Sequence, residues 1–275
     1  MTGAHACIDH VFGVGDFYVG TSGFASPAMR AAVPSATSVA ADLLAGYGRV
    51  FGSVELDSVF YRHPSAETVR TWRDATPESF RFSVRMPREF THVERLAAPD
   101  MPPQFIASLS DLGPRLGAVL FTTPPTFGCD VDRFRDVLDR LPNGVRTTWE
   151  FRHPSWMCPD VLELLAQRES CPVIVESLEA ASRTDLLPGG VLADRYEFPF
   201  VYVRFRRESY TYADLVVWGD MLGDVLGEGR DVYAFFRQSP EAACYATALG
   251  ELLAEAKAAT FAAPVMVQPG LPAFQ

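Results

Sequence analysis

The sequence contains no uninterrupted apolar run of about 18 residues, the minimum that a membrane-spanning helix needs. Its first residues, from Met1 to His5, also lack the basic stretch and long apolar core of a secretory signal. These absences argue against a membrane or secreted protein. They predict no membrane partner and a cytoplasmic location.

Cysteine is scarce and has no informative spacing. The sequence holds five cysteines, an odd number, and no Cys-x-x-Cys pair. They are Cys7, Cys129, Cys158, Cys171 and Cys244. Neither a disulfide framework nor a structural zinc site is indicated, and no cofactor is signalled.

Lysine is almost missing, because Lys257 is the single lysine among 24 basic residues. We attribute so broad a bias to genome composition, so an arginine in place of a lysine is weak evidence of special chemistry. Acidic residues still outnumber basic ones, and the formal charge is −10. The long-range field therefore disfavours nucleic acid as a partner, although a local positive pocket is compatible with it.

What the chain does contain is a regular alternation of short apolar runs and amphipathic stretches. With 275 residues and 48% apolar content, it can form one large core, and we expect a single domain over 1–275 with a core at about 17–258 and two terminal extensions. Continuous apolar runs are typical of parallel strands covered on both faces. The eight predicted strands are 17–20, 54–56, 80–84, 118–121, 146–150, 173–175, 200–205 and 232–236.

Helices are predicted between these strands. Ser65 can cap one helix, and Pro159 suits the first turn of another. Apolar residues at helical spacing mark further helices over 132–141, 212–226 and 241–258. The stretch 177–197 is irregular and is predicted to be a long loop or a lid after the sixth strand.

Alternating strands and helices of this number predict an α/β fold, a single (β/α)8 TIM-type barrel with eight parallel strands. In such a barrel the carboxyl ends of the strands meet at one mouth, where ligand sites lie. Functional residues are therefore expected at the strand ends.

Several ordered motifs resemble those of the DUF72 (YecE-like) family. The motifs are YVGTSG at 18–23, VELDSVFY at 54–61, PSAETV at 64–69, FRFSVR at 80–85, LGAVLF at 116–121, EFRHPSW at 150–156, YVR at 202–204 and YAFF at 233–236. The resemblance implies a TIM-type barrel and brings no established reaction. The sequence departs from the family pattern at Phe24, Asp57, Arg85, Thr122, Arg206, Arg207, Arg237 and Gln238.

Charged residues collect at the predicted strand ends, and they favour a pocket for an anionic small molecule. Arginine side chains bind phosphate or carboxylate through paired hydrogen bonds. Glu55, Glu150 and His153 are the candidate catalytic residues, as general bases or acids. The candidate ligand contacts are Thr21, Ser22, Asp57, Tyr61, Arg85, His92, Arg152, Trp156, Arg204, Arg206 and Arg237.

Three other interpretations remain open. The charged residues could be buried pairs that hold loops in place, without any catalysis. Glu55, Glu150, His153, Glu176 and His92 could instead hold a divalent metal of a phosphodiesterase, endonuclease-like or isomerase barrel, although no His-x-His spacing supports it and nearby arginines would repel the ions. Aromatic residues beside arginines could also stack on the bases of single-stranded nucleic acid, or bind a protein, in a barrel without enzymatic activity.

Overall fold

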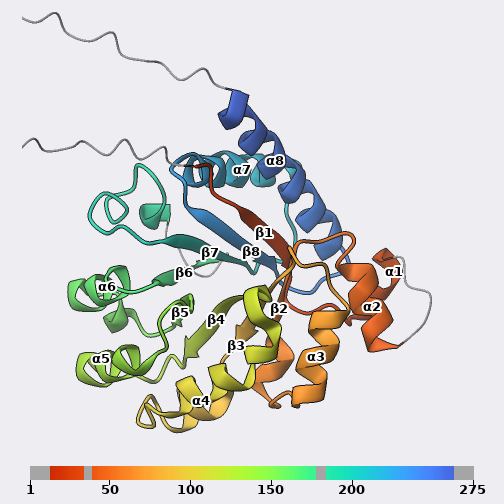
Figure 1. Cartoon of the computed structure of the whole chain (residues 1–275). Coiled ribbons are helices and arrows are strands. Elements are labelled where there is room, and N and C mark those ends of the chain that lie inside the picture. Colours follow the sequence, from red (N-terminus) through yellow and green to blue (C-terminus); the bar gives the residue numbers. More distant parts are fainter. Residues whose placement is uncertain (1–12, 34–38, 178–183, 263–275) are drawn as a thin grey trace, which may run out of the picture.

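The computed structural model of the chain describes residues 13–33, 39–177 and 184–262. Its eight strands are all parallel and follow the order β1-β8-β7-β6-β5-β4-β3-β2, and helices lie outside the strands (Figure 1). The predicted TIM-type barrel is confirmed, and each predicted strand overlaps an observed one. The strands are β1 (Phe17–Thr21), β2 (Ser53–Leu56), β3 (Arg81–Arg85), β4 (Leu116–Thr123), β5 (Thr147–Phe151), β6 (Ser170–Glu176), β7 (Phe200–Phe205) and β8 (Asp231–Phe236).

The barrel closes between β1 and β2, where an isolated bridge joins Ser22 to Glu55. The Tyr47 hydroxyl fills the adjacent part of this seam: it accepts from the Thr21 amide over 2.9 Å and donates to the Ser53 carbonyl over 3.1 Å. The strands approach so closely that a Cβ on Gly20 would lie 1.9 Å from the Ser53 oxygen. A side-chain hydroxyl thus supplies hydrogen bonds that a strand pair would otherwise make.

Helices cover the outside of the barrel, and the sequence marks where several begin. Ser65 caps α3 by accepting from the Thr68 amide, and Pro159 begins α6, both as predicted. Thr211 and Asp214 form a reciprocal capping box at α7. The helices are α1 (Pro27–Ala32), α2 (Ala40–Tyr47), α3 (Ala66–Asp74), α4 (Met101–Ser108), α5 (Val131–Arg140), α6 (Pro159–Ala166), α7 (Tyr212–Gly227) and α8 (Ala242–Ala262).

Short helical turns lie between the strands and helices. After strands come η1 (Asp57–Phe60), the π-helical turn η2 (Glu89–Val93), η4 (Pro154–Trp156) and η5 (Thr184–Leu186), and η3 (Ser110–Arg115) lies between α4 and β4. Of the predicted loop at 177–197, the part from 184 onward contains η5 and is otherwise irregular, and 178–183 lie outside the described residues.

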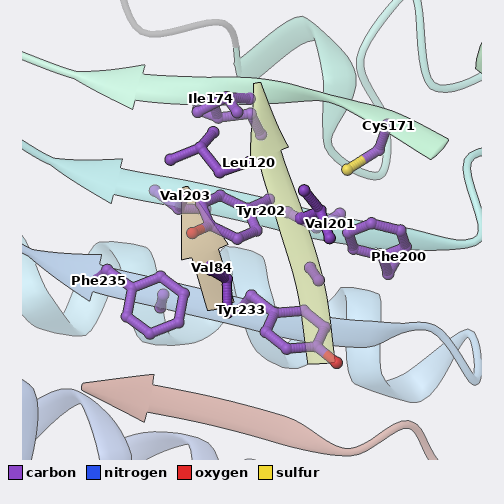
Figure 2. Packing of buried hydrophobic residues seen from close by; sticks show 14 of the residues in the cluster. Val84, Leu120, Cys171, Ile174, Phe200, Val201, Tyr202, Val203, Tyr233 and Phe235 are labelled. Atoms are coloured by element: carbon purple, nitrogen blue, oxygen red, sulfur yellow. The ribbon is translucent and has the colours of Figure 1, made fainter. Parts of the chain in front are cut away.

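Large side chains fill the barrel interior (Figure 2). The Tyr202 ring stacks on Tyr233 at 6.0 Å between centroids and contacts Phe235 at 5.3 Å. Leu120 from β4 is fully buried in the same interior. Buried side chains therefore fill the barrel below its mouth. Polar groups at the mouth lie directly above this layer of aromatic and aliphatic side chains.

Within the described ranges, no helix combines the length and the hydropathy needed to cross a bilayer. Four of the five cysteines are described, and all four are free thiols. Cys7 lies outside the described residues.

Candidate functional site

Arg204, near the carboxyl end of β7, is the centre of a buried ion-pair network. Its Nη2 lies 2.8 Å from Glu55 Oε1 on β2 and 3.3 Å from Asp57 Oδ1 in η1. Its Nη1 donates to Glu150 Oε2 on β5. The Arg204 side chain is 3% exposed, and Glu55 is fully buried. One guanidinium thus joins the ends of β2, β5 and β7.

Side-chain alternation along β7 explains this position. Tyr202 and Arg204 are separated by one residue, so both point into the barrel. The Tyr202 hydroxyl donates to Glu55 Oε2 over 2.7 Å and lies 2.6 Å from Ser83 Oγ on β3. Arg204, two residues further along the strand than Tyr202, lies above the aromatic layer, at the mouth.

Arg206 continues the same alternation and reaches the β1–β2 seam. Its Nη2 lies 3.2 Å from Glu55 Oε1, and its Nη1 lies 3.2 Å from Ser22 Oγ. The Ser22 hydroxyl donates to the same Glu55 oxygen over 2.6 Å. Both oxygens of Glu55 are therefore held by hydrogen bonds from protein groups.

Glu150 is held in a similar way. Arg152, two residues further along the chain, donates from Nε to Glu150 Oε1 over 2.8 Å. Arg204 binds the other oxygen. Glu150 is buried, whereas the Arg152 side chain is 43% exposed. Arg152 consequently presents positive charge to solvent at the rim.

Arg85, at the end of β3, is a buried cation with weak compensation. Its Nη1 lies 3.4 Å from Asp57 Oδ1, an oxygen that Arg204 shares. Its guanidinium carbon lies 3.7 Å from the centroid of the Phe60 ring, a cation–π contact. The His92 ring meets the same Phe60 ring edge-on at 5.1 Å. The network therefore extends from the barrel axis to η1 and η2.

Cations outnumber carboxylates in this network. Its charged members are Arg85, Arg152, Arg204, Arg206, Glu55, Asp57 and Glu150. With four cations and three anions, this network carries an excess of one positive charge, although the whole chain is acidic.

The carboxylates differ in proton affinity. Burial alone would raise the pKa of Glu55, but Arg204 and Arg206 hold the pKa at about 2. Glu150 behaves in the same way, with its pKa lowered by Arg204 and Arg152 against the effect of burial. Burial and the neighbouring Glu55 charge raise the pKa of Asp57. Glu55 and Glu150 are therefore firmly ionised, and Asp57 holds a proton more readily.

Several bases at the mouth have lowered pKa values. Burial and the charge of Arg204 lower the pKa of both Arg85 and Arg206. Burial, Arg152 and Arg85 lower the pKa of His92 to about 4, so its ring is neutral at pH 7. Burial is the largest cause of each shift, and the neighbouring arginine charges add to it.

Five buried side-chain atoms have no hydrogen-bond partner among the described residues, and all lie at or just after the carboxyl ends of β3, β4 and β7: Arg85 Nε, Thr122 Oγ1, Thr123 Oγ1, Arg204 Nε and Arg207 Nε. Thr122 pairs in register with Glu150 and so faces the same side of the sheet. Buried donors without partners are costly in folded proteins. Their concentration at one end of the barrel indicates that this end is not optimised for stability alone.

Besides His92, five predicted site residues make no ion pair or hydrogen bond with the charged residues of the network. Thr21 belongs to the β1–β2 seam, where its hydroxyl donates to the Gly23 carbonyl. Trp156, predicted to line the mouth, is instead fully buried, stacks on Phe151 and donates to the Phe127 carbonyl, so it has no surface for a ligand. His153 caps η4 and pairs with Ser155. Tyr61 and Arg237 are exposed.

The sequence reasoning missed Tyr202 and Ser83 and gave Phe60 no cation–π role. Tyr202 could have been found from alternation, because it precedes Arg204 and Arg206 at intervals of two in β7. The Phe60 contact with Arg85 had no such signal, since it depends on how η1 folds over the end of β3.

The described residues include no group of three or more His, Cys, Asp or Glu side chains arranged to hold a metal ion. The Arg204 guanidinium occupies the position between the three carboxylates that a cation would take. The carboxylates are thus already neutralised by protein cations.

A separate cavity of about 600 Å³ lies at the opposite end of the barrel. Its walls include Arg168, Pro199 and Arg230, which precede β6, β7 and β8. None of the predicted site residues lines this cavity.

The chain is similar to members of a known protein family. The family described as "Protein of unknown function DUF72" matches residues 18–269. The UPF0759 protein YecE of Escherichia coli K12 is 33% identical over 112 residues, which cover 40% of this chain and 41% of YecE. The chain thus matches less than half the length of this relative.

Solved structures agree on the fold. A DUF72 family protein from Enterococcus faecalis V583 superposes with a TM-score of 0.69 at 19% identity, covering 86% of this chain and 95% of the other. A DUF72 family protein from Thermotoga maritima MSB8 gives 0.67 at 22% identity, covering 87% and 99%. At these identities the likeness concerns the barrel alone.

Proposed function

The chain belongs to the DUF72 family, whose description assigns no activity, and we propose from its own site that the barrel mouth binds a small anionic molecule. The observation that carries the proposal is Arg85, a buried guanidinium whose single ion-pair partner among the described residues is Asp57 at 3.4 Å. Its Nε has no hydrogen-bond partner within that part of the chain. An anion above Arg85 would compensate a charge that the protein leaves poorly balanced.

Neighbouring groups support the same ligand. Arg206 and the partly exposed Arg152 can supply further donors, as guanidinium groups suit phosphate and carboxylate oxygens. A bound anion would also offset the charges of Arg152 and Arg85, which add to burial in lowering the pKa of His92. A phosphorylated or carboxylated small molecule is therefore the ligand class that we propose.

In this proposal Glu55 and Glu150 position arginines and do not act as general bases. A carboxylate with a low pKa binds a proton weakly, and both groups are fully hydrogen-bonded. His153 has no role in proton transfer here, because it caps η4. Action on the ligand, a nucleic-acid partner disfavoured by the net charge and a cytoplasmic location remain predictions from the sequence.

The test is calorimetric titration of the full chain with inorganic phosphate and with sulfate at constant ionic strength. We expect saturable binding that Arg85→Gln weakens by about tenfold or more, since a hydrogen bond to a charged group contributes about 1.5–3 kcal/mol. Arg85→Lys should retain part of the affinity, because it keeps the charge. Arg140→Gln is the matched control, an exposed arginine on α5.

Two results would contradict the proposal. One is the absence of saturable binding of either anion to the wild-type chain. The other is an affinity that Arg85→Gln and Arg140→Gln change equally, which would indicate a general charge effect.

A further inference from the structure

Beside the mouth lies a crevice of about 270 Å³ between η1 and η2. The aromatic side chains of Phe60 and Tyr61 line it, together with Val93, and Arg88 and Glu89 also contribute. Tyr61 is 80% exposed and Val93 58% exposed. Two large apolar side chains therefore face solvent next to a ring that is already part of the charged network.

Phe60 connects the crevice with the anion site. Its ring lines the crevice and also lies 3.7 Å from the Arg85 guanidinium carbon. His92 packs edge-on against the same ring, and Tyr61 does so at 5.0 Å. One aromatic ring thus separates the unbalanced cation from the apolar surface.

The η2 wall of the crevice is held in place. Phe90 within η2 is fully buried, and Leu96, just after it, is 1% exposed. Arg95 and Leu96 both adopt positive φ, at 47° and 64°, which costs free energy for residues other than glycine. Such strain and π-helical turns often occur at functional sites. A wall fixed before binding lowers the entropic cost of holding a ligand.

We propose that the anion bound at the mouth carries a planar apolar group, such as an aromatic ring, which occupies the crevice between Phe60, Tyr61 and Val93. This inference rests on the proposed anion-binding function and names its ligand class more narrowly. The negative group sits against Arg85 and its neighbours, and the ring packs on the exposed apolar side chains. The crevice has room for one ring and not for a large ligand. It would therefore select the apolar substituent that the anion carries, and not the rest of the ligand.

The experiment compares phenyl phosphate with methyl phosphate, two monoesters that differ in the apolar group, by calorimetric titration. We expect phenyl phosphate to bind about tenfold more tightly, as contact of one ring face with apolar surface would produce. Tyr61→Ala and Val93→Ser should each reduce this preference severalfold, while methyl phosphate affinity stays unchanged. Tyr212→Ala is the matched control, because Tyr212 is 66% exposed and begins α7.

The outcomes separate the two proposals. Equal affinities for the two esters, both weakened by Arg85→Gln, would overturn the apolar subsite and leave the anion site intact. A preference for phenyl phosphate that survives both Tyr61→Ala and Val93→Ser would also overturn the subsite. If neither ester binds, the anion-binding function itself fails.

Discussion

Replacing Arg204 with methionine should strongly destabilise the barrel. The substitution keeps a long side chain and removes the guanidinium that joins Glu55, Asp57 and Glu150. Two buried carboxylates then lose their main compensating charge. Breaking a buried pair by removal of one partner typically costs about 3–5 kcal/mol.

The pKa of Glu55 gives a second measure of the cost. The network lowers this pKa from 4.5 to about 2, which corresponds to about 3 kcal/mol in favour of the ionised form. Because the pKa is lower in the folded state, the stabilisation is present above about pH 4.5 and disappears as the pH falls towards 2. The lowered pKa of Glu150 acts in the same direction.

The assay is urea unfolding of wild type and Arg204→Met at pH 7 and at pH 4.5. Without Arg204 the buried carboxylates should take up protons at a higher pH, so the loss of stability is largest at pH 7 and smaller at pH 4.5. Adding Glu150→Gln to Arg204→Met should recover part of the loss, because it removes one uncompensated charge. Arg140→Met, an exposed ion-pair partner of Asp136, should change stability little.

A difference between wild type and Arg204→Met that is the same at both pH values would refute this reasoning. A loss below about 1 kcal/mol at pH 7 would do so as well, since it would place the pair among weak surface interactions.

Three further expectations follow from the same structure. Tyr47→Phe should lower the free energy of unfolding by about 1–3 kcal/mol, measured by urea, because the Thr21 amide and Ser53 carbonyl lose a buried partner. The ring protons of His92 should titrate near pH 4 in NMR spectra, and saturating phosphate should raise that midpoint; an unperturbed midpoint near 6.5 would contradict the burial and the nearby charges. Arg85→Gln should leave the urea midpoint unchanged or raise it, because burial and Arg204 disfavour the Arg85 cation.

The eight strands could be predicted from the sequence because parallel strands of a barrel are covered on both faces. Strand β7 reads as an uninterrupted apolar run up to Arg204, and its predicted and observed bounds coincide. The predicted range of β4 stops two residues before the observed carboxyl end. Thr122 and Thr123 are buried strand residues there, although their side chains are polar. Local composition therefore located the strands better than it located their ends.

The site residues that lie on strands were predictable from the sequence, and those in the turns after the strands were not. Glu55, Glu150 and Arg204 lie on strands, so alternation and a shared barrel end bring them together. Trp156 and His153 follow the end of β5, where the chain turns into η4 and side-chain alternation no longer determines direction. Their positions depend on local turns and packing that the spacing of residues does not encode.

The remaining question is whether the network is a scaffold or a binding site, and Arg85 distinguishes the two. A scaffold would be expected to pair its buried charges, as Arg204 does with three carboxylates. Arg85 instead has one ion-pair partner among the described residues, which it shares with Arg204, and its pKa is lowered by burial and by the Arg204 charge. We expect such a side chain to lower stability, and the anion proposed to bind at the mouth would account for its presence there. We expect Arg85→Gln to leave stability unchanged or raise it and to weaken phosphate binding. If the substitution instead destabilises the barrel and leaves phosphate affinity unchanged, Arg85 belongs to the scaffold.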